Sequence, residues 1–124
     1  MNNTTISRIG IVLYALVIGF FGINHFLNRT GVQNAVPSFL PGGVFWVYLT
    51  GAAMIAASIS FLFNKQTRLA GILLAVLLLL IVFTIHLPAV MHAPDDAAKR
   101  LPMINLLKDT GLAAAALIIA GRGR

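Results

Sequence analysis

The chain has 124 residues, of which 59% are hydrophobic and only 10% are charged. Soluble domains are about 25% charged, so this chain has too few charged side chains to cover a water-facing surface. The same composition excludes a disordered chain and a collagen-like repeat. The absence of Cys excludes disulfides and thiol chemistry within the chain. We therefore expect an integral membrane protein.

Long uncharged segments predict four membrane-spanning helices, at about residues 8–28, 43–63, 69–91 and 102–121. Each is long enough to cross about 30 Å of hydrocarbon. Repeated alternation of polar and apolar residues, which a β-barrel requires, is missing from the continuously apolar stretch 73–82. The predicted fold class is all-α, a polytopic four-helix bundle that forms a single domain over residues 1–124.

The first segment can also be read as a signal peptide. No small-residue cleavage site follows it in Asn24-His25-Phe26-Leu27, and cleavage normally needs such a site. We therefore expect this helix to be retained.

Basic residues mark the ends of the predicted spans and indicate topology rather than nucleic-acid binding. Five lie on one side, namely Arg8, Lys65, Arg68, Arg122 and Arg124, and three lie on the other, namely Arg29, Lys99 and Arg100. By the positive-inside rule, we expect both termini in the cytoplasm. Small residues at four-residue spacing indicate close helix packing, and they leave a homo-oligomer open.

Polar residues gather at the predicted outer ends of the helices, whereas the cytoplasmic halves are almost wholly apolar. From this layer we select candidate ligand-binding residues: His25, His86, Asn105, Lys108, Asp109, Asn24 and Tyr48. The connection 29–42 lies beside them in this topology. It can cap the layer as a lid, or simply seal the bundle.

Asp109 is the candidate that cannot easily leave the membrane. With the fourth helix starting near residue 102, it lies about 9 Å along the axis, where a charge is costly unless it is paired. Lys108 has a long stem and can snorkel to the head groups. As a neighbour in sequence, it is expected to be a poor partner for Asp109. We expect Asp109 to turn toward His86 or His25, with Asn105 able to bridge Asp109 or Lys108. The alternative is a structural clamp between the third and fourth helices.

Other polar residues have simpler interpretations. Asp95 and Asp96 have the pattern of turn and helix-capping residues. With His92 they do not match the ligand spacing of a known metal site, so no metal is predicted. Pro88 removes a backbone hydrogen bond to the carbonyl of Thr84, which is tolerated near a helix end. No catalytic residue can be assigned.

Several of these segments resemble the DoxX family of small bacterial membrane proteins. They are Phe20-Phe21-Gly22-Ile23-Asn24-His25-Phe26, the stretch Asn105-Leu106-Leu107-Lys108-Asp109, Arg8 at the start of the first helix and Pro37–Pro41 before the second. The resemblance implies a four-helix bundle in a bacterial cytoplasmic (inner) membrane. It also implies an association with redox systems, such as a quinone-reducing thiosulfate oxidoreductase subunit. It implies importance for Arg8, His25, Lys108 and Asp109. Sulfur chemistry is doubtful in a chain without Cys.

These observations lead to several expected functions. The first is a binding protein that holds a quinone, an isoprenoid or another lipophilic molecule in a bundle pocket, with its polar head near His86 and Asp109. The second is a non-catalytic accessory subunit or scaffold of a membrane oxidoreductase complex. A small-solute transporter ranks lowest, because the cytoplasmic half lacks a polar path. An enzyme acting alone would use Asp109 and His86 as an acid–base pair, and we do not expect this.

Overall fold

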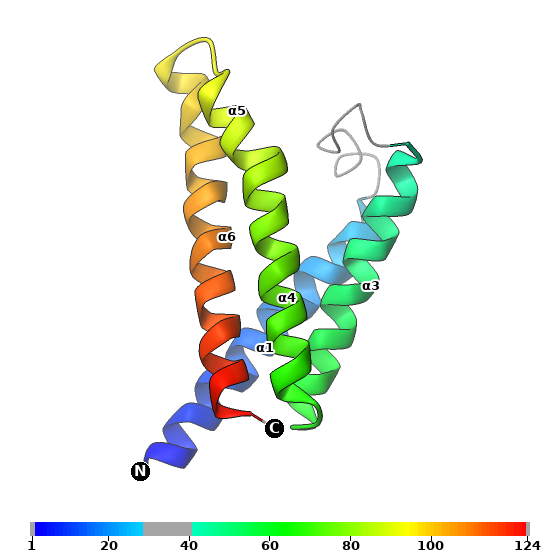
Figure 1. The fold of residues 1–124 in the computed structure, drawn as a ribbon, viewed down its shortest axis with the longest axis vertical. Helices are drawn as coiled ribbons and strands as arrows, with labels where there is room; N and C mark the ends of the chain where they lie inside the picture. The colour runs from blue at the N-terminus through cyan, green and yellow to red at the C-terminus, as the bar shows by residue number, and fades with distance from the viewer. Residues whose placement is uncertain (1, 29–40, 124) are drawn as a thin grey trace.

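The computed structural model describes residues 2–28 and 41–123, and the connection predicted as a lid lies almost entirely outside this range. The described chain consists of helices (Figure 1): α1 (Asn3–Leu27), α3 (Gly43–Leu62), α4 (Thr67–Ile81), the π-helical turn η1 (Val82–His86), α5 (Leu87–Met91) and α6 (Asp96–Arg122). The α4, η1 and α5 segments follow one another without a break, giving four long helices. The predicted all-α four-helix fold is confirmed.

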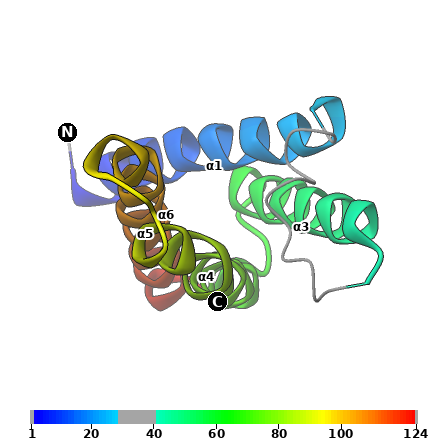
Figure 2. The ribbon, with the colours of Figure 1, turned by 90° about the horizontal axis from the view of Figure 1, so that it is seen from above.

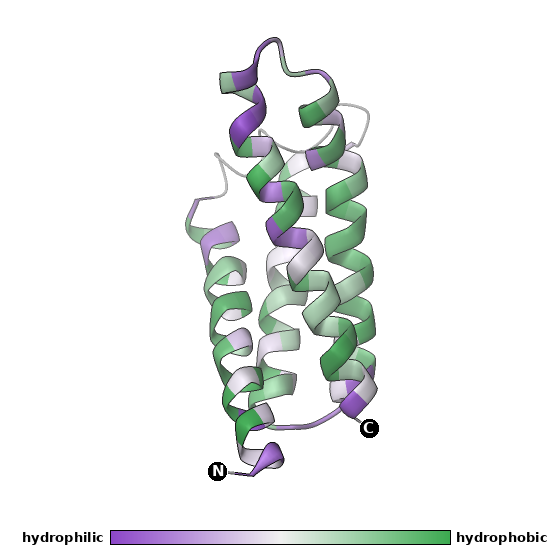
Figure 3. Ribbon diagram, turned by 90° about the vertical axis from the view of Figure 1, so that its left-hand side faces the viewer, coloured by the Kyte–Doolittle hydropathy of each residue, from purple (hydrophilic) through white to green (hydrophobic). Residues whose placement is uncertain are grey.

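In the part of the chain that the structure describes, four helices are long and apolar enough to cross a membrane, with Thr67–Met91 counted as one. The chain is therefore a multi-pass membrane protein. Figure 3 shows hydrophilic residues gathered at the two ends of the bundle, with apolar helix surface between them. A further hydrophilic stretch lies in the upper half of α6 in that view, within the apolar part of the bundle.

The helices form two pairs, α1 with α3 and α4 with α6 (Figures 1 and 2). The pairs meet mainly through α3 and α4, which a short turn joins at the end of the bundle where both termini lie. We call this the terminal end and the opposite one the loop end. Toward the loop end α3 diverges from α4 (Figure 1).

Helix caps explain why two helices begin earlier than predicted. The side chain of Asn2 accepts a hydrogen bond from the Thr5 amide, and α1 starts at Asn3 instead of residue 8. Asp95 accepts one from the Ala98 amide at 2.7 Å, so α6 starts at Asp96 instead of residue 102. The predicted capping role of Asp95 is confirmed. Pro102 is accommodated inside α6, although Pro normally disfavours a helix interior.

Small residues let the helices of each pair approach closely. A Cβ atom on Gly22 would lie 2.8 Å from the Gly51 carbonyl, and one on Gly71 would lie 2.6 Å from the Ala116 carbonyl. Backbones this close gain dispersion contacts that lipid tails cannot supply equally well. The core is built from buried apolar side chains of all four helices: Ala15, Ile18, Met54, Ala57, Phe61, Leu74, Ala75, Leu78, Ala113, Ala116 and Ile119.

Polar groups also join α1 to α3. Arg8 donates hydrogen bonds to the carbonyls of Phe61 and Leu62 in the last turn of α3, where carbonyls no longer have the amide of a following helical turn as a partner. Ser58 donates to the Ala15 carbonyl at 2.7 Å in a buried position. These bonds fix the α1–α3 pair and leave the α4–α6 pair to supply its own polar contacts.

Candidate functional site

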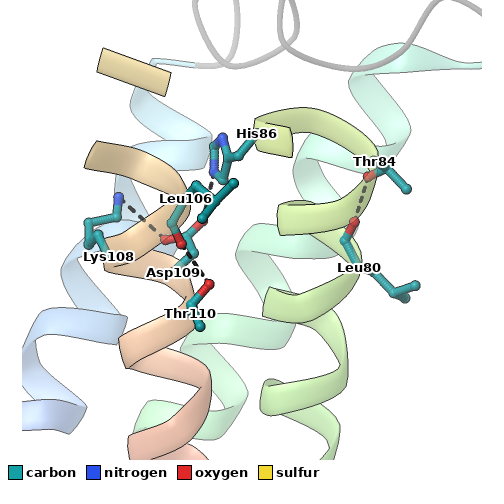
Figure 4. Close-up of polar contacts among 7 residues, drawn as sticks. All are labelled: Leu80, Thr84, His86, Leu106, Lys108, Asp109 and Thr110. Carbon is teal, nitrogen blue, oxygen red and sulfur yellow. Dashed lines mark hydrogen bonds and ion pairs between the residues drawn. The ribbon is translucent and has the colours of Figure 1, made fainter. Parts of the chain in front are cut away.

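The polar contact between α6 and its neighbour is formed by His86 and Asp109. His86 Nε2 lies 2.8 Å from Asp109 Oδ2, with side-chain exposures of 15% and 9% (Figure 4). With the proton on Nε2, the imidazole donates to the carboxylate. Because water is largely excluded here, the hydrogen bond offsets part of the cost of placing ionisable groups in an apolar bundle. The predicted turn of Asp109 toward His86 is confirmed.

Lys108, which was predicted as a site residue, also pairs with Asp109. Its Nζ lies 3.5 Å from Asp109 Oδ1 (Figure 4) and 4.6 Å from the centre of the Phe21 ring on α1. The expectation that adjacent residues are poor partners was wrong because the long Lys side chain folds back along the helix. The Phe21 ring face attracts the ammonium group, which therefore has a second partner within the bundle. We call His86, Lys108 and Asp109 the polar cluster.

A local irregularity positions His86. The backbone forms a π-helical turn over Val82–His86, and the Leu87 amide bonds to the Val82 carbonyl five residues back. Pro88 provides a cause, since it has no amide hydrogen to give to the Thr84 carbonyl. Thr84 donates its hydroxyl to the Leu80 carbonyl at 2.6 Å (Figure 4). Such turns are rare and occur often at functional sites.

Asp109 lies midway between the ends of α6, Asp96 and Arg122, about 20 Å along the axis from each. Because α6 starts at Asp96 rather than at residue 102, Asp109 lies further from the start of its helix than predicted. The chain has three acidic residues in all, and the other two, Asp95 and Asp96, stand at the start of α6. Asp109 is thus the one acidic residue that lies in the middle of a membrane-length helix rather than at or before its start.

Comparison with known families assigns the chain to a family whose activity is not known. Residues 14–120 match DUF8561, a domain of unknown function. The chain belongs to this family. The DUF8561 match includes the whole polar cluster and the π-helical turn. Searches of curated proteins and of solved structures gave no match.

Tyr14 connects α1 of this DUF8561 protein to α6 beyond the polar cluster. Its hydroxyl donates to the Leu112 carbonyl at 2.5 Å, and its ring lies tilted beside Phe61. The side chain is half-buried. Together with the contact between Lys108 and Phe21, this bond holds α1 against the α4–α6 pair.

The other predicted site residues do not join the polar cluster. The ring of His25 bonds through Nδ1 to the Phe21 carbonyl of its own helix, at 2.7 Å. Tyr48 stacks on Phe26 with ring centres 5.3 Å apart, and Asn24 is half-buried near the end of α1. All three belong to the α1–α3 pair. Sequence order placed them in one layer with His86, but the pairing of helices separates them.

Asn105 lies on α6, one turn before Asp109 on the side of the loop end, and is half-buried. Within residues 2–28 and 41–123, no hydrogen bond links its side chain to Lys108 or Asp109. Phe21 and the π-helical turn were not predicted as part of the site. Pro88 was the available signal for the turn, whereas nothing in the sequence marks Phe21 as the partner of Lys108.

Two apolar grooves in the described part of the chain lie away from the polar cluster. One, of about 280 Å³, lies between α3 and α4 and is lined mainly by Ala and Leu. The other, of about 240 Å³, lies between α1 and α6 near the termini. As for metals, no group of three His or Asp side chains among the described residues is arranged to hold an ion.

Proposed function

We propose that this DUF8561 protein binds a lipophilic molecule with a polar head, such as a quinone or an isoprenoid, and that the head contacts the polar cluster. The supporting observation is the His86–Asp109 pair within membrane-length helices, with Lys108 beside it. Ionisable groups inside a membrane are costly and most often serve a function. The structural alternative is a clamp, in which the His86–Asp109 pair only holds two helices together and no ligand is involved.

The polar cluster offers suitable hydrogen-bond donors for a carbonyl or hydroxyl head group. Asp109 is 9% exposed and largely closed off, whereas Lys108 is 41% exposed and reachable. A head group would therefore meet the ammonium of Lys108 and the outer edge of the His86 ring. A carbonyl oxygen can accept from the Lys108 ammonium, and a hydroxyl head group can donate to His86 Nδ1, which is an acceptor when Nε2 carries the proton. The apolar tail would then lie along the helices, in surroundings as apolar as lipid.

The π-helical turn gives further support. A regular helix would carry the His86 side chain to a different angle around the axis, because each residue of an α-helix advances by about 100°. The π-helical turn over Val82–His86 replaces regular α-helical backbone hydrogen bonds at this position. A simple clamp between two helices can be made with regular geometry.

The proposed setting is a bacterial cytoplasmic membrane with both termini in the cytoplasm. Arg8, Lys65, Arg68 and Arg122 lie at the terminal end, and Lys99 and Arg100 lie at the loop end. This bias supports the orientation. We also propose kinship with the DoxX family, on the motifs quoted above, and with it an association with membrane redox systems.

Ligand binding can be tested by thermal unfolding in mild detergent with a short-chain ubiquinone analogue or farnesol. A ligand at 100 times its dissociation constant stabilises the folded state by about 2.7 kcal/mol, which raises Tm by several degrees in a chain of this size. We expect this shift in the native chain and in the control Asp96→Asn, and its loss in Asp109→Asn. A clamp without ligand binding predicts a lower Tm for Asp109→Asn and no probe-induced shift in any chain, which would contradict the proposal.

A further inference from the structure

The groove between α1 and α6 lies at the terminal end, away from the polar cluster. Its walls are mostly apolar and come from Ile11 on α1 and from Ala115, Ile118 and Ile119 on α6. Tyr14 lines its inner part. Figures 1 and 2 both show the first turns of α1 beside α6. The groove therefore offers an elongated apolar surface that opens toward the surroundings of the bundle.

The outer part of the same groove is polar and positively charged. Ser7, in the second turn of α1, and Arg122, the last residue of α6, both line it. The three acidic residues of the chain are Asp95, Asp96 and Asp109, and none belongs to the lining. A bound anion would therefore meet a guanidinium and a hydroxyl without an opposing carboxylate in the groove.

From this combination we infer that the groove binds one acyl chain of an anionic phospholipid, with the phosphate on Arg122 and Ser7. The planar guanidinium matches two phosphate oxygens, and the Ser hydroxyl can donate to a third. Basic pockets between membrane helices select anionic head groups in this way. The inference does not depend on the proposed function, because the groove and the polar cluster share no residue.

Gly10 provides a sharp test because it leaves the floor of the groove open. It lines the groove, and a Cβ atom added to it would meet nothing within 4 Å. A Leu side chain at this position therefore begins in open space on the lining of the groove, where we expect it to occupy part of the place of the acyl chain. Replacing Gly within a helix also favours the helix, so Gly10→Leu is expected to fold.

The experiment is native mass spectrometry of the full chain in detergent, titrated with phosphatidylglycerol and with phosphatidylcholine. We expect the native chain to bind one phosphatidylglycerol about fivefold more tightly than phosphatidylcholine. In Gly10→Leu, phosphatidylglycerol should bind roughly tenfold more weakly, since two methylene groups or more lose their place. Arg122→Gln should bind both lipids equally.

Two controls separate the groove from general effects. Gly111→Leu adds the same side chain on α6 at another position with nothing within 4 Å, and Arg68→Gln removes a basic residue outside the groove lining. Both should bind phosphatidylglycerol as the native chain does, and millimolar inorganic phosphate should not displace the lipid. Native affinity in folded Gly10→Leu, equal binding of the two lipids by the native chain, or displacement by phosphate would overturn the inference. If Gly10→Leu failed to fold, the Arg122→Gln variant would still test the inference. An unchanged preference of this variant for phosphatidylglycerol would overturn it.

Discussion

The histidines of the two helix pairs have different kinds of hydrogen-bond partner. In the α4–α6 pair, His86 reaches across to Asp109 on the other helix. In the α1–α3 pair, His25 bonds to the Phe21 carbonyl within its own helix, and the helices are held by the close approach of Gly22 and Gly51. Both pairs also pack closely through small residues. The difference is that the α4–α6 pair has an ionisable pair between two side chains, whereas the hydrogen bonds between α1 and α3, from Arg8 and Ser58, go to backbone carbonyls.

This difference shows where polar chemistry is concentrated. A histidine that bonds to the backbone of its own helix forms its hydrogen bond locally, without a partner on another helix. A histidine bonded across helices makes two segments depend on one buried pair, and removing either partner leaves a costly polar group behind. The polar cluster should therefore be sensitive to substitution, and His25 should be tolerant.

The largest effect is expected for Asp109→Ala. Removing the carboxylate leaves His86 and Lys108 without their shared partner, which should lower the free energy of unfolding by about 2–4 kcal/mol. Unfolding in a detergent titration would measure this. Asp96→Ala serves as the control, because it removes only a charge in the first turn of α6 and should cost less than about 1 kcal/mol. Equal losses in the two variants would show that the contact of Asp109 with His86 does not stabilise the α4–α6 pair.

Gly51→Leu should come next, and it tests the other helix pair. A Cβ atom at Gly51 would lie 2.8 Å from the His25 Cβ and 2.9 Å from the Gly22 carbonyl, so α1 and α3 must separate. Overpacking of this kind costs about 1–3 kcal/mol. The same detergent titration applies, with Gly111→Leu as a matched variant in open space. If Gly51→Leu were as stable as Gly111→Leu, close packing of α1 on α3 would be refuted.

Tyr14→Phe should have an intermediate effect, since Tyr14 joins the two helix pairs. The change removes the hydrogen bond to the Leu112 carbonyl but keeps the ring against Phe61. We expect a loss of about 1 kcal/mol. An additional loss of ligand binding would extend the site to Tyr14. Unchanged stability would show that this bond does not help to hold α1 against α6.

The smallest effect is expected for His25→Leu. Its ring bond lies within α1, so the change in stability should stay within about 0.5 kcal/mol, and binding of the quinone analogue should persist. Measured beside His86→Leu, this variant compares the two histidines directly. A larger effect for His25→Leu than for His86→Leu would reverse the comparison.

Sequence reasoning predicted the four helices because their apolar segments are long and sharply bounded by charges and turn residues. It missed the first six residues of α6, since Lys99, Arg100 and Pro102 interrupt the apolar pattern, although the capping role of Asp95 was recognised. Helix starts depend on local hydrogen bonds such as the one from the Ala98 amide. The hydropathy pattern indicates where a helix becomes apolar enough to lie in lipid, which can be several residues after the first residue of the helix.

For the candidate site, sequence reasoning predicted the contact of Asp109 with His86 because a membrane carboxylate needs a partner. It could not separate His86 from His25, since both lie near the same end of the bundle and only the pairing of helices decides between them. The π-helical turn and the position of Lys108 over Phe21 depend on tertiary packing. Neither has a specific sequence pattern beyond Pro88.

The double variant His86→Leu with Asp109→Leu tests the central claim most directly. Replacing both partners of a buried hydrogen bond with apolar groups can leave stability nearly unchanged, so this chain should remain folded. Mass spectrometry of the lipophiles that co-purify from native membranes should then find a quinone or isoprenoid with the native chain and none with the double variant. Equal recovery of the same molecule from both folded chains would contradict a head-group site at His86 and Asp109.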